Sequence, residues 1–203
     1  MGTPTLIIVS GPAGSGKTTL AHELSAAAGC PALCRDEIKE GMVASNPGFV
    51  PAISDPLTVR TYELFFEAIA LFLKAEVTLV AEAAFQHTIW WQGLQPLTDL
   101  ATLKIIRCHV PDAVARERQL ARLAAQATRT AHADTEHLSV DRTFDAIHVD
   151  APTLDVDTGD GWHPSLDVIV AFAAPDPWIA RKPHEAGPGE QLRTCGGRTP
   201  GRG

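Results

Sequence analysis

Eight consecutive residues, Gly11-Pro-Ala-Gly-Ser-Gly-Lys-Thr18, have the types and spacing needed to hold a polyphosphate. They fit the pattern G-x-x-x-x-G-K-[ST], in which a glycine-rich turn leaves backbone N–H groups free to point inwards at an anion. An apolar run precedes the turn and a helix-forming run follows it, so the first N–H groups and the dipole of that helix add to the site. The context favours a phosphate-binding P-loop over a turn that binds nothing.

This motif predicts a nucleotide and Mg²⁺, and we take the nucleotide to be ATP. Lys17 is expected to reach the β- and γ-phosphates, and the hydroxyl of Thr18 is expected to bind Mg²⁺. The motif does not say what happens to the γ-phosphate. The residues expected to contact ATP are Gly11, Pro12, Ala13, Gly14, Ser15, Gly16, Lys17, Thr18 and Thr19.

Strand patterns alternate with helix patterns along the chain. We expect strands at 5–10, 31–35, 77–81, 103–110 and 152–156, and helices at 16–28, 37–44, 57–75, 87–101, 112–127 and 164–173. Such alternation predicts parallel βαβ units in a doubly wound α/β sheet, which binds ligands at the carboxyl ends of its strands. We expect one domain over residues 1–180 with a lid at about 116–140. The segment 181–203, rich in Gly, Pro and Arg, is expected to be a disordered tail.

Two carboxylates follow expected strands. Asp36 follows the second strand, where it could orient an acceptor hydroxyl and take its proton, or could cap the next helix. Glu82 ends the third strand, where it could hold a Mg²⁺-bound water or bind the substrate. The sequence leaves both pairs of alternatives open. Arg35, Phe85 and Gln86 are further candidates for contacts with the acceptor, because they adjoin these two carboxylates.

Arginines cluster in the helix expected after residue 111. Arg118 and Arg122 lie four positions apart and therefore share one helix face. Arginines on a lid stabilise the charge that spreads over the γ-phosphate oxygens during phosphoryl transfer. The alternative is a solvated helix face that pairs with Glu117 and Asp112. We expect at least one of Arg118 and Arg122 to act on phosphate.

The net charge and the cysteine content limit the kinds of partner that the protein is expected to have. The net charge is −7, and because the tail carries five basic and two acidic side chains, residues 1–180 carry −10. An acidic body argues against a broad nucleic-acid surface, so we expect a small-molecule acceptor. Cys30 and Cys34 lack a second pair or histidines at zinc spacing, which argues against a zinc site. No stretch has the length of a membrane span and no signal peptide is recognisable, so we expect a cytoplasmic protein with free thiols.

Five segments together resemble a known group. They are the P-loop, Cys34-Arg-Asp-Glu-Ile-Lys39, Val80-Ala-Glu-Ala-Ala-Phe85, Arg118-x-x-x-Arg122 and Val156-Asp-Thr158. The chain resembles the AAA_33-type P-loop kinase-like ATPases over about residues 5–175. That group is similar to chloramphenicol phosphotransferase, zeta-toxin kinases, gluconate kinase and polynucleotide kinase domains. The resemblance implies a sheet ordered 2-3-1-4-5, Asp36 as catalytic base, Arg118 or Arg122 as lid arginine, and Lys17 and Thr18 as phosphate and Mg²⁺ ligands.

The resulting hypothesis is a phosphotransferase that moves the γ-phosphate of ATP to a hydroxyl of an antibiotic, sugar, nucleoside or sugar nucleotide. Two alternatives stay open, namely an ATPase that acts on a protein partner and a nucleic-acid 5′-end kinase. The acidic body opposes the second alternative, and the single strand-end Glu82 disfavours the first. The sequence names neither the acceptor nor the oligomeric state.

Overall fold

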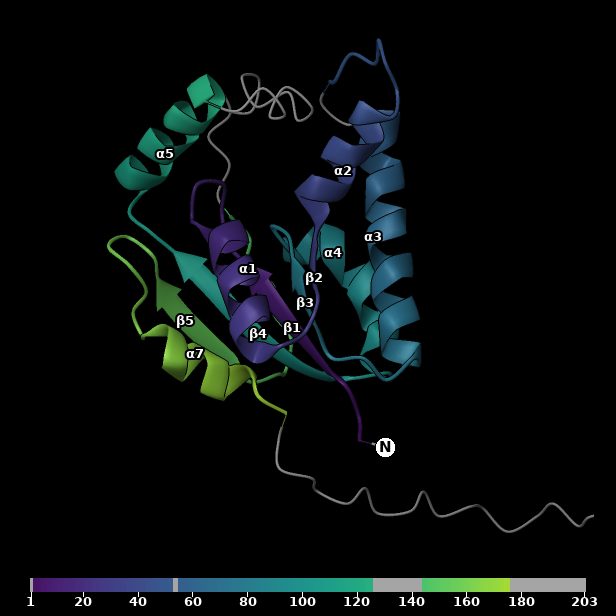
Figure 1. Ribbon diagram of the computed structural model, residues 1–203, viewed down its shortest axis with the longest axis vertical. Coiled ribbons are helices and arrows are strands. Elements are labelled where there is room, and N and C mark those ends of the chain that lie inside the picture. Colours follow the sequence, from purple (N-terminus) through teal and green to yellow (C-terminus); the bar gives the residue numbers. More distant parts are fainter. Residues whose placement is uncertain (1, 53–54, 126–143, 176–203) are drawn as a thin grey trace, which may run out of the picture.

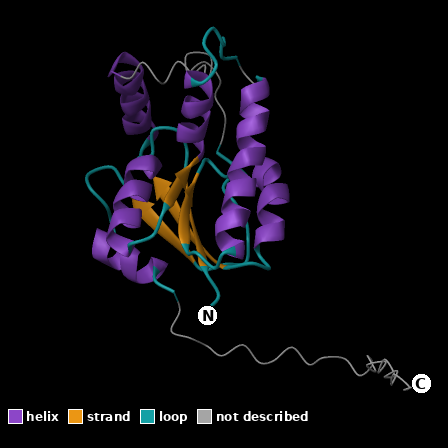
Figure 2. Cartoon of the chain, turned by 45° about the vertical axis from the view of Figure 1, so that its right-hand side comes forward, coloured by secondary structure: helices purple, strands orange, loops and turns teal. Residues whose placement is uncertain are grey.

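A computed structural model describes residues 2–52, 55–125 and 144–175 (Figure 1). Five parallel strands form one sheet in the order β2-β3-β1-β4-β5, which confirms the expected fold class and strand order. Helices cover both faces of this sheet (Figure 2). The elements are β1 (Thr5–Ser10), α1 (Lys17–Ala28), β2 (Ala32–Cys34), α2 (Arg35–Ala44), α3 (Pro56–Lys74), β3 (Leu79–Glu82), α4 (His87–Leu94) with the 3₁₀ turn Gln95–Leu97, β4 (Thr102–His109), α5 (Asp112–Ala125), β5 (Thr153–Asp157) and α7 (Leu166–Ala173). The tail and much of the expected lid lie outside the described residues.

Strand β1 lies at the centre of the sheet and is buried along its whole length. Its side chains alternate between two hydrophobic cores, because successive residues of a strand point to opposite faces. Leu6 and Ile8 pack in the core beneath α3 and α4. Ile7 and Val9 pack in the core beneath α1 and α7. This continuous apolar run fixes the strand that leads into the P-loop.

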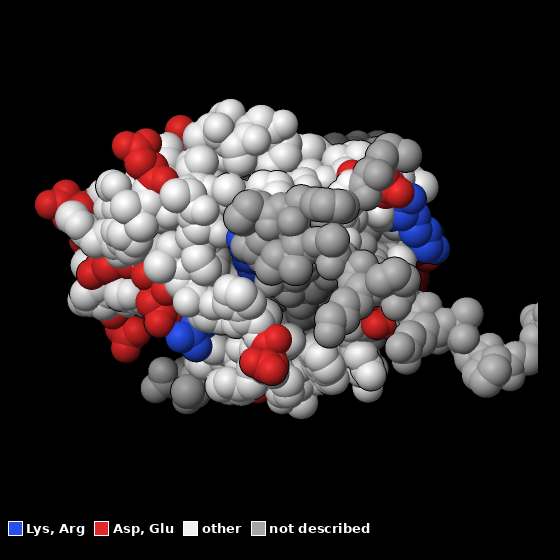
Figure 3. Space-filling model, turned by 90° about the horizontal axis from the view of Figure 1, so that it is seen from below, with Lys and Arg blue, Asp and Glu red and all other residues white. Residues whose placement is uncertain are grey.

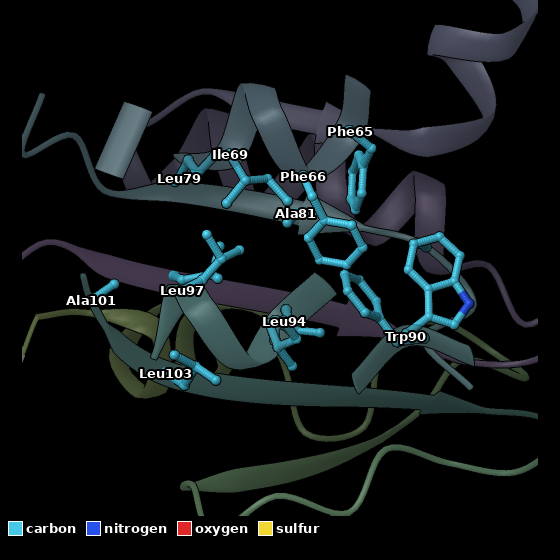
Figure 4. Packing of buried hydrophobic residues seen from close by; sticks show 14 of the residues in the cluster. Phe65, Phe66, Ile69, Leu79, Ala81, Trp90, Leu94, Leu97, Ala101 and Leu103 are labelled. Atoms are coloured by element: carbon cyan, nitrogen blue, oxygen red, sulfur yellow. The ribbon is translucent and has the colours of Figure 1, made fainter. Parts of the chain in front are cut away.

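Aromatic side chains hold α3 and α4 against the sheet (Figure 4). The rings of Phe65 and Trp90 meet edge to face at 5.9 Å. Phe66 lies 5.8 Å from Trp90 in the same cluster. These contacts make the aromatic stripe of α3 part of the core and anchor the start of α4, which follows the loop after β3.

Helices α2 and α3 are joined by a buried ion pair. The ammonium group of Lys39 on α2 donates to Asp55 Oδ2 at 2.8 Å and to Thr58 Oγ1 at 2.7 Å. Asp55 also caps α3, because its Oδ1 accepts the backbone N–H of Thr58 at 2.7 Å. Burial alone would raise the pKa of Asp55, but the hydrogen bond from Lys39 and those from two backbone N–H groups bring the pKa below its ordinary value. The pair fixes α2 beside α3.

Helix α2 begins two residues earlier than the sequence suggested, at Arg35 instead of residue 37. Its N-cap position is Cys34, and Asp36 lies within its first turn. The alternative that Asp36 caps this helix is therefore wrong. Cys34 still has extended backbone dihedrals, so strand β2 passes directly into the helix and leaves no separate cap residue between them.

The surface agrees with an acidic body. On the face shown in Figure 3, acidic side chains appear in several groups and basic ones in isolated patches, without a continuous basic stripe where described residues are visible. Within the described ranges, every helix is too short or too polar to cross a membrane.

Candidate active site

The P-loop connects β1 to α1 and depends on glycine at points of close approach. Gly14 and Gly16 have φ values of 81° and 74°, which side chains rarely tolerate. A Cβ atom at Gly14 would overlap the backbone carbonyl of Ala115 on α5. A Cβ atom at Gly11 would lie 2.5 Å from the carbonyl oxygen of Cys108 on β4. The loop is therefore packed tightly against β4 and α5, and Gly16 lies immediately before the first turn of α1.

Two polar side chains support the P-loop backbone from outside. Thr158, after β5, donates its hydroxyl to the Ser15 carbonyl at 2.6 Å, and it is almost completely buried. Gln119 on α5 donates its amide to the Ala13 carbonyl at 2.9 Å. Both bonds fix carbonyl groups on the outer side of the loop. Sequence reasoning assigned no role to Gln119, because a glutamine on an exposed helix face gives no signal of a distant partner.

Lys17 and Glu82 meet behind the loop. The ammonium nitrogen of Lys17 lies 3.8 Å from Glu82 Oε1 and 3.5 Å from the Pro12 carbonyl oxygen. Glu82 is 1% exposed, and burial raises the pKa of its carboxyl group above the ordinary value. Attraction to Lys17 opposes this rise, whereas repulsion from Asp36 adds to it. The site therefore contains a buried carboxylate whose charge depends on a neighbouring cation.

The second oxygen of this carboxylate is suited to a divalent cation. Glu82 Oε2 is buried and has no hydrogen-bond partner among the described residues. The Thr18 hydroxyl contacts the Glu82 carboxylate and lowers its pKa. Mg²⁺ prefers oxygen ligands, often one or two carboxylates completed by phosphate and water. A hydroxyl and an unsatisfied carboxylate oxygen at the end of a phosphate-binding loop fit that ion.

Asp36 and Arg35 lie at the start of α2, next to Glu82. Cys34, just before them, pairs with Glu82 in the sheet, and the Asp36 charge is close enough to raise the pKa of Glu82. Arg35 Nη1 donates to Asp36 Oδ1 at 3.0 Å. The Asp36 side chain is 32% exposed and can meet a molecule from solvent. The buried Nε of Arg35 has no partner in the described part of the chain.

Arg118 and Arg122 lie on α5, which flanks the carboxyl edge of the sheet on the side away from α2 (Figure 1). The guanidinium of Arg118 donates to the carbonyl oxygens of Thr158 and Gly159 at 2.8 and 2.9 Å. It also lies beside Gly16 of the P-loop. Arg122 follows one turn later and is half-buried. The contact of either arginine with a γ-phosphate stays a prediction.

Phe85 and Gln86, two expected contacts of the acceptor near Glu82, lie in different surroundings. Phe85 is completely buried, with its ring 5.1 Å from that of Trp90. Its ring belongs to the hydrophobic core, so the expected contact with an acceptor is corrected to a packing role. Gln86 precedes α4 and is half-buried at the same edge of the sheet. Only Gln86 of these two is placed where it could meet a bound molecule.

Solved structures share this fold. A presumed kinase from Chloroflexus aurantiacus is 28% identical, with a TM-score of 0.73 over 84% of this chain and 96% of that one. A sugar kinase from Janibacter sp. is 15% identical, with a TM-score of 0.56 over 84% and 94%. The APS kinase CysC of Mycobacterium tuberculosis, solved with AMPPNP and APS, is 16% identical, with a TM-score of 0.53 over 84% and 94%. The last two share the fold alone.

No curated protein matches the chain. The fold is that of P-loop NTPases, with the glycine-rich loop between β1 and α1. The family model AAA_33, described as an AAA domain, matches residues 6–147 and thus more than half of the sequence. The protein therefore belongs to the AAA_33 family.

Proposed function

We propose that the protein is an ATP-dependent phosphotransferase that acts on a hydroxyl group of a small molecule. One observation carries the proposal. A phosphate-binding lysine, a P-loop threonine and two carboxylates, Glu82 and Asp36, gather at one edge of the sheet. The partly exposed Asp36 is a group that can take a proton from an acceptor, which a loop that only binds nucleotide does not need.

The chain's own residues divide the reaction between them. The P-loop N–H groups and Lys17 hold the phosphates of ATP and stabilise the charge on the transferred group. Thr18 and Glu82 would hold Mg²⁺, which neutralises charge on the β- and γ-phosphates when bound. Asp36 orients the acceptor hydroxyl and takes its proton. The acceptor oxygen forms a bond to the γ-phosphorus as the bond from that phosphorus to the bridging oxygen breaks, and ADP leaves.

Several features support a small acceptor. Residues 1–180 carry a net charge of −10, which repels a long phosphate backbone. Asp36, Arg35 and Gln86 are partly buried at the carboxyl edge, where a compact molecule can be enclosed. One structural neighbour is named as a sugar kinase, and another is named as an APS kinase. We infer the class of acceptor from these features and leave its identity to experiment.

The test is ATP turnover by the purified protein with a panel of hydroxyl compounds. The panel holds aminoglycosides, chloramphenicol-like antibiotics, sugars, nucleosides, UDP-sugars and short 5′-OH oligonucleotides. We expect one class of small compound to raise ADP release many-fold and to gain the mass of one phosphate. Steady ADP release that no compound alters would instead indicate an ATPase with a protein partner. Phosphorylation of the oligonucleotides alone would indicate an end kinase.

A further inference from the structure

Three side chains that can bind a metal meet beside β2, next to the phosphate site. His22 projects from α1, Cys34 ends β2, and Glu37 lies in the first turn of α2. One potential ligand atom from each lies within 4.8 Å of the other two. Strand β2 runs alongside α1 and passes directly into α2 (Figure 1). The chain topology therefore brings a histidine twelve residues away in sequence to the cysteine.

The separations are close to those of a tetrahedral site. Bonds of zinc to nitrogen, oxygen and sulfur place neighbouring ligand atoms about 3.3 to 3.6 Å apart. His22 Nε2 lies 3.8 Å from Cys34 Sγ. The same nitrogen lies 2.6 Å from Glu37 Oε1, a hydrogen-bond distance that must lengthen by less than about 1 Å to admit a metal ion. Small rotations of two exposed side chains provide that change.

One of the three side chains is buried and two are exposed, which suits a metal site that is open to solvent on one side. Cys34 is 2% exposed and is held by the sheet. The side chains of His22 and Glu37 are about half exposed, at 50% and 52%. An ion held by the three would therefore face solvent on one side, where water supplies a fourth ligand. None of the three ligands is Lys17, Thr18, Glu82 or Asp36, although the cluster adjoins the phosphate site, because the Cys34 thiol lies beside the Glu82 carboxylate.

We propose that His22, Cys34 and Glu37 form a Zn²⁺ site with water as the fourth ligand. The ligand types select the ion, because a thiol and an imidazole together favour Zn²⁺ over Mg²⁺ or Ca²⁺, which take oxygen ligands. Binding replaces the hydrogen bond between His22 and Glu37 by two metal bonds. The Cys34 thiol loses its proton to solvent as the sulfur–metal bond forms, and no electrons are transferred.

Titration with Co²⁺ in the absence of nucleotide tests the site. Cobalt takes the place of zinc, and a bound thiolate gives a charge-transfer absorption band in the near ultraviolet. We expect the wild-type protein to show this band at one equivalent, and added Zn²⁺ to remove it by competition. Cys34→Ser should lose the band. His22→Gln and Glu37→Gln should keep the fold and weaken Co²⁺ binding by at least about tenfold, because each removes one of three ligands.

Matched controls separate this cluster from other ligands of the chain. Cys30→Ser removes the nearest other thiol in sequence, Cys195→Ser removes the thiol outside the described residues, and Glu23→Gln alters the exposed acid next to His22. All three variants should bind Co²⁺ as the wild type does. A band that persists in Cys34→Ser, or its absence from the wild-type protein, would overturn the proposal.

A second measurement covers the case in which a ligand variant unfolds. An ion that binds only the folded state raises the melting temperature in proportion to the logarithm of its concentration once the site fills. We expect Zn²⁺ to raise the Tm of wild type and of Cys30→Ser, and to raise that of His22→Gln much less. Equal shifts in all three would contradict the assignment. Neither measurement uses ATP or an acceptor, so failure of the phosphotransferase proposal leaves this one intact.

Discussion

The ammonium nitrogen of Lys17 lies 3.8 Å from Glu82 Oε1, so the cation that should bind phosphate also neutralises the buried strand-end acid. The positive charge of Lys17 and the negative charge of Glu82 stabilise each other. When a polyphosphate binds, Lys17 gains a new partner, and Glu82 Oε2 has no hydrogen bond to lose among the described residues. Attraction to Lys17 therefore offsets part of the cost of burying the Glu82 charge.

Replacing Lys17 by alanine should abolish phosphoryl transfer. The variant removes the cation that reaches the β- and γ-phosphates, and we expect ADP release to fall by at least about a hundredfold. Nucleotide affinity, measured by calorimetry, should fall as well. His22→Gln serves as a control on the same helix that leaves the P-loop intact. Turnover by Lys17→Ala at the wild-type rate would refute the assignment of this loop.

Replacing Glu82 by glutamine should raise stability at neutral pH while lowering activity. Burial raises the pKa of Glu82 above its ordinary value, so the folded protein holds this proton at pH values where the unfolded chain has released it. Stability therefore falls as pH rises from the unfolded pKa through the folded one. Glutamine removes this loss, and we expect a Tm higher by about 2–4 °C, which corresponds to about 1 kcal/mol.

The measurement for Glu82 is a series of thermal melts from pH 4 to pH 8 on both proteins. The two curves should converge near the acid end and diverge towards neutral pH. Glu63→Gln, at an exposed position on α3, is the control for loss of one negative charge. Parallel curves for Glu82→Gln and wild type across this range would show that the buried carboxylate does not change its protonation on folding.

Replacing Asp36 by asparagine should preserve ATP binding and abolish transfer. The amide keeps the shape of the side chain but cannot take a proton, and loss of a general base costs about 10²- to 10⁴-fold in rate. Single-turnover kinetics with the acceptor found in the panel would measure the loss. Glu23→Gln, which changes an exposed carboxylate on α1, should leave the transfer rate within about twofold. Full activity of Asp36→Asn would mean that Asp36 is not the base.

Replacing Thr158 by valine should weaken ATP binding through the P-loop backbone. The buried hydroxyl donates to the Ser15 carbonyl at 2.6 Å, and valine leaves that carbonyl without this donor. A lost buried hydrogen bond costs about 1–3 kcal/mol, so we expect an ATP dissociation constant roughly tenfold higher. Thr153→Val, an exposed position on β5 whose hydroxyl bonds to the nearby Ala151 carbonyl, is the matched control. Equal ATP affinities for the two variants would contradict this role.

Replacing Lys39 by methionine should destabilise the protein without direct loss of chemistry. The change leaves Asp55 buried without its counter-ion, and we expect unfolding to be easier by about 3–5 kcal/mol. Asp55→Asn added to this variant should recover part of the loss, because asparagine is neutral and still caps α3. Urea denaturation measures both changes. Lys74→Met, at the exposed end of α3, should change stability by less than about 0.5 kcal/mol.

Asp55 also gives a pH test of the same ion pair. Its pKa in the folded protein lies below its ordinary value, so its contribution to stability is complete above the pKa of the unfolded chain and is lost as pH falls through the folded pKa. Wild-type protein should therefore lose stability on acidification below about pH 4 more steeply than Lys39→Met. Identical acid limbs for the two proteins would show that the ion pair makes no net contribution.

Local sequence patterns were enough to predict the sheet and the phosphate loop. The apolar run of β1, the spacing from Gly11 to Thr18 and the alternation of strands with helices are local patterns, and right-handed crossovers then leave few ways to order the strands. The strand order agrees with the order that the family resemblance implied. The main elements lie within a few residues of the expected ones, except that α4 ends at Leu94 and the expected helix ran to residue 101. Element ends were less predictable, because β2 passes into α2 without a local cap signal.

Contacts between side chains that are distant in sequence could not be predicted and become visible in the folded chain. Thr158 reaches Ser15 across 143 positions of sequence, and Lys17 reaches Glu82 across the sheet. Phe85 was expected to face an acceptor and instead packs in the core, with its ring against that of Trp90. Cys34 is a further example, because the residues near it in the sequence show no zinc-binding pattern. A side-chain cluster depends on how helices pack against strands, and no local spacing records that packing.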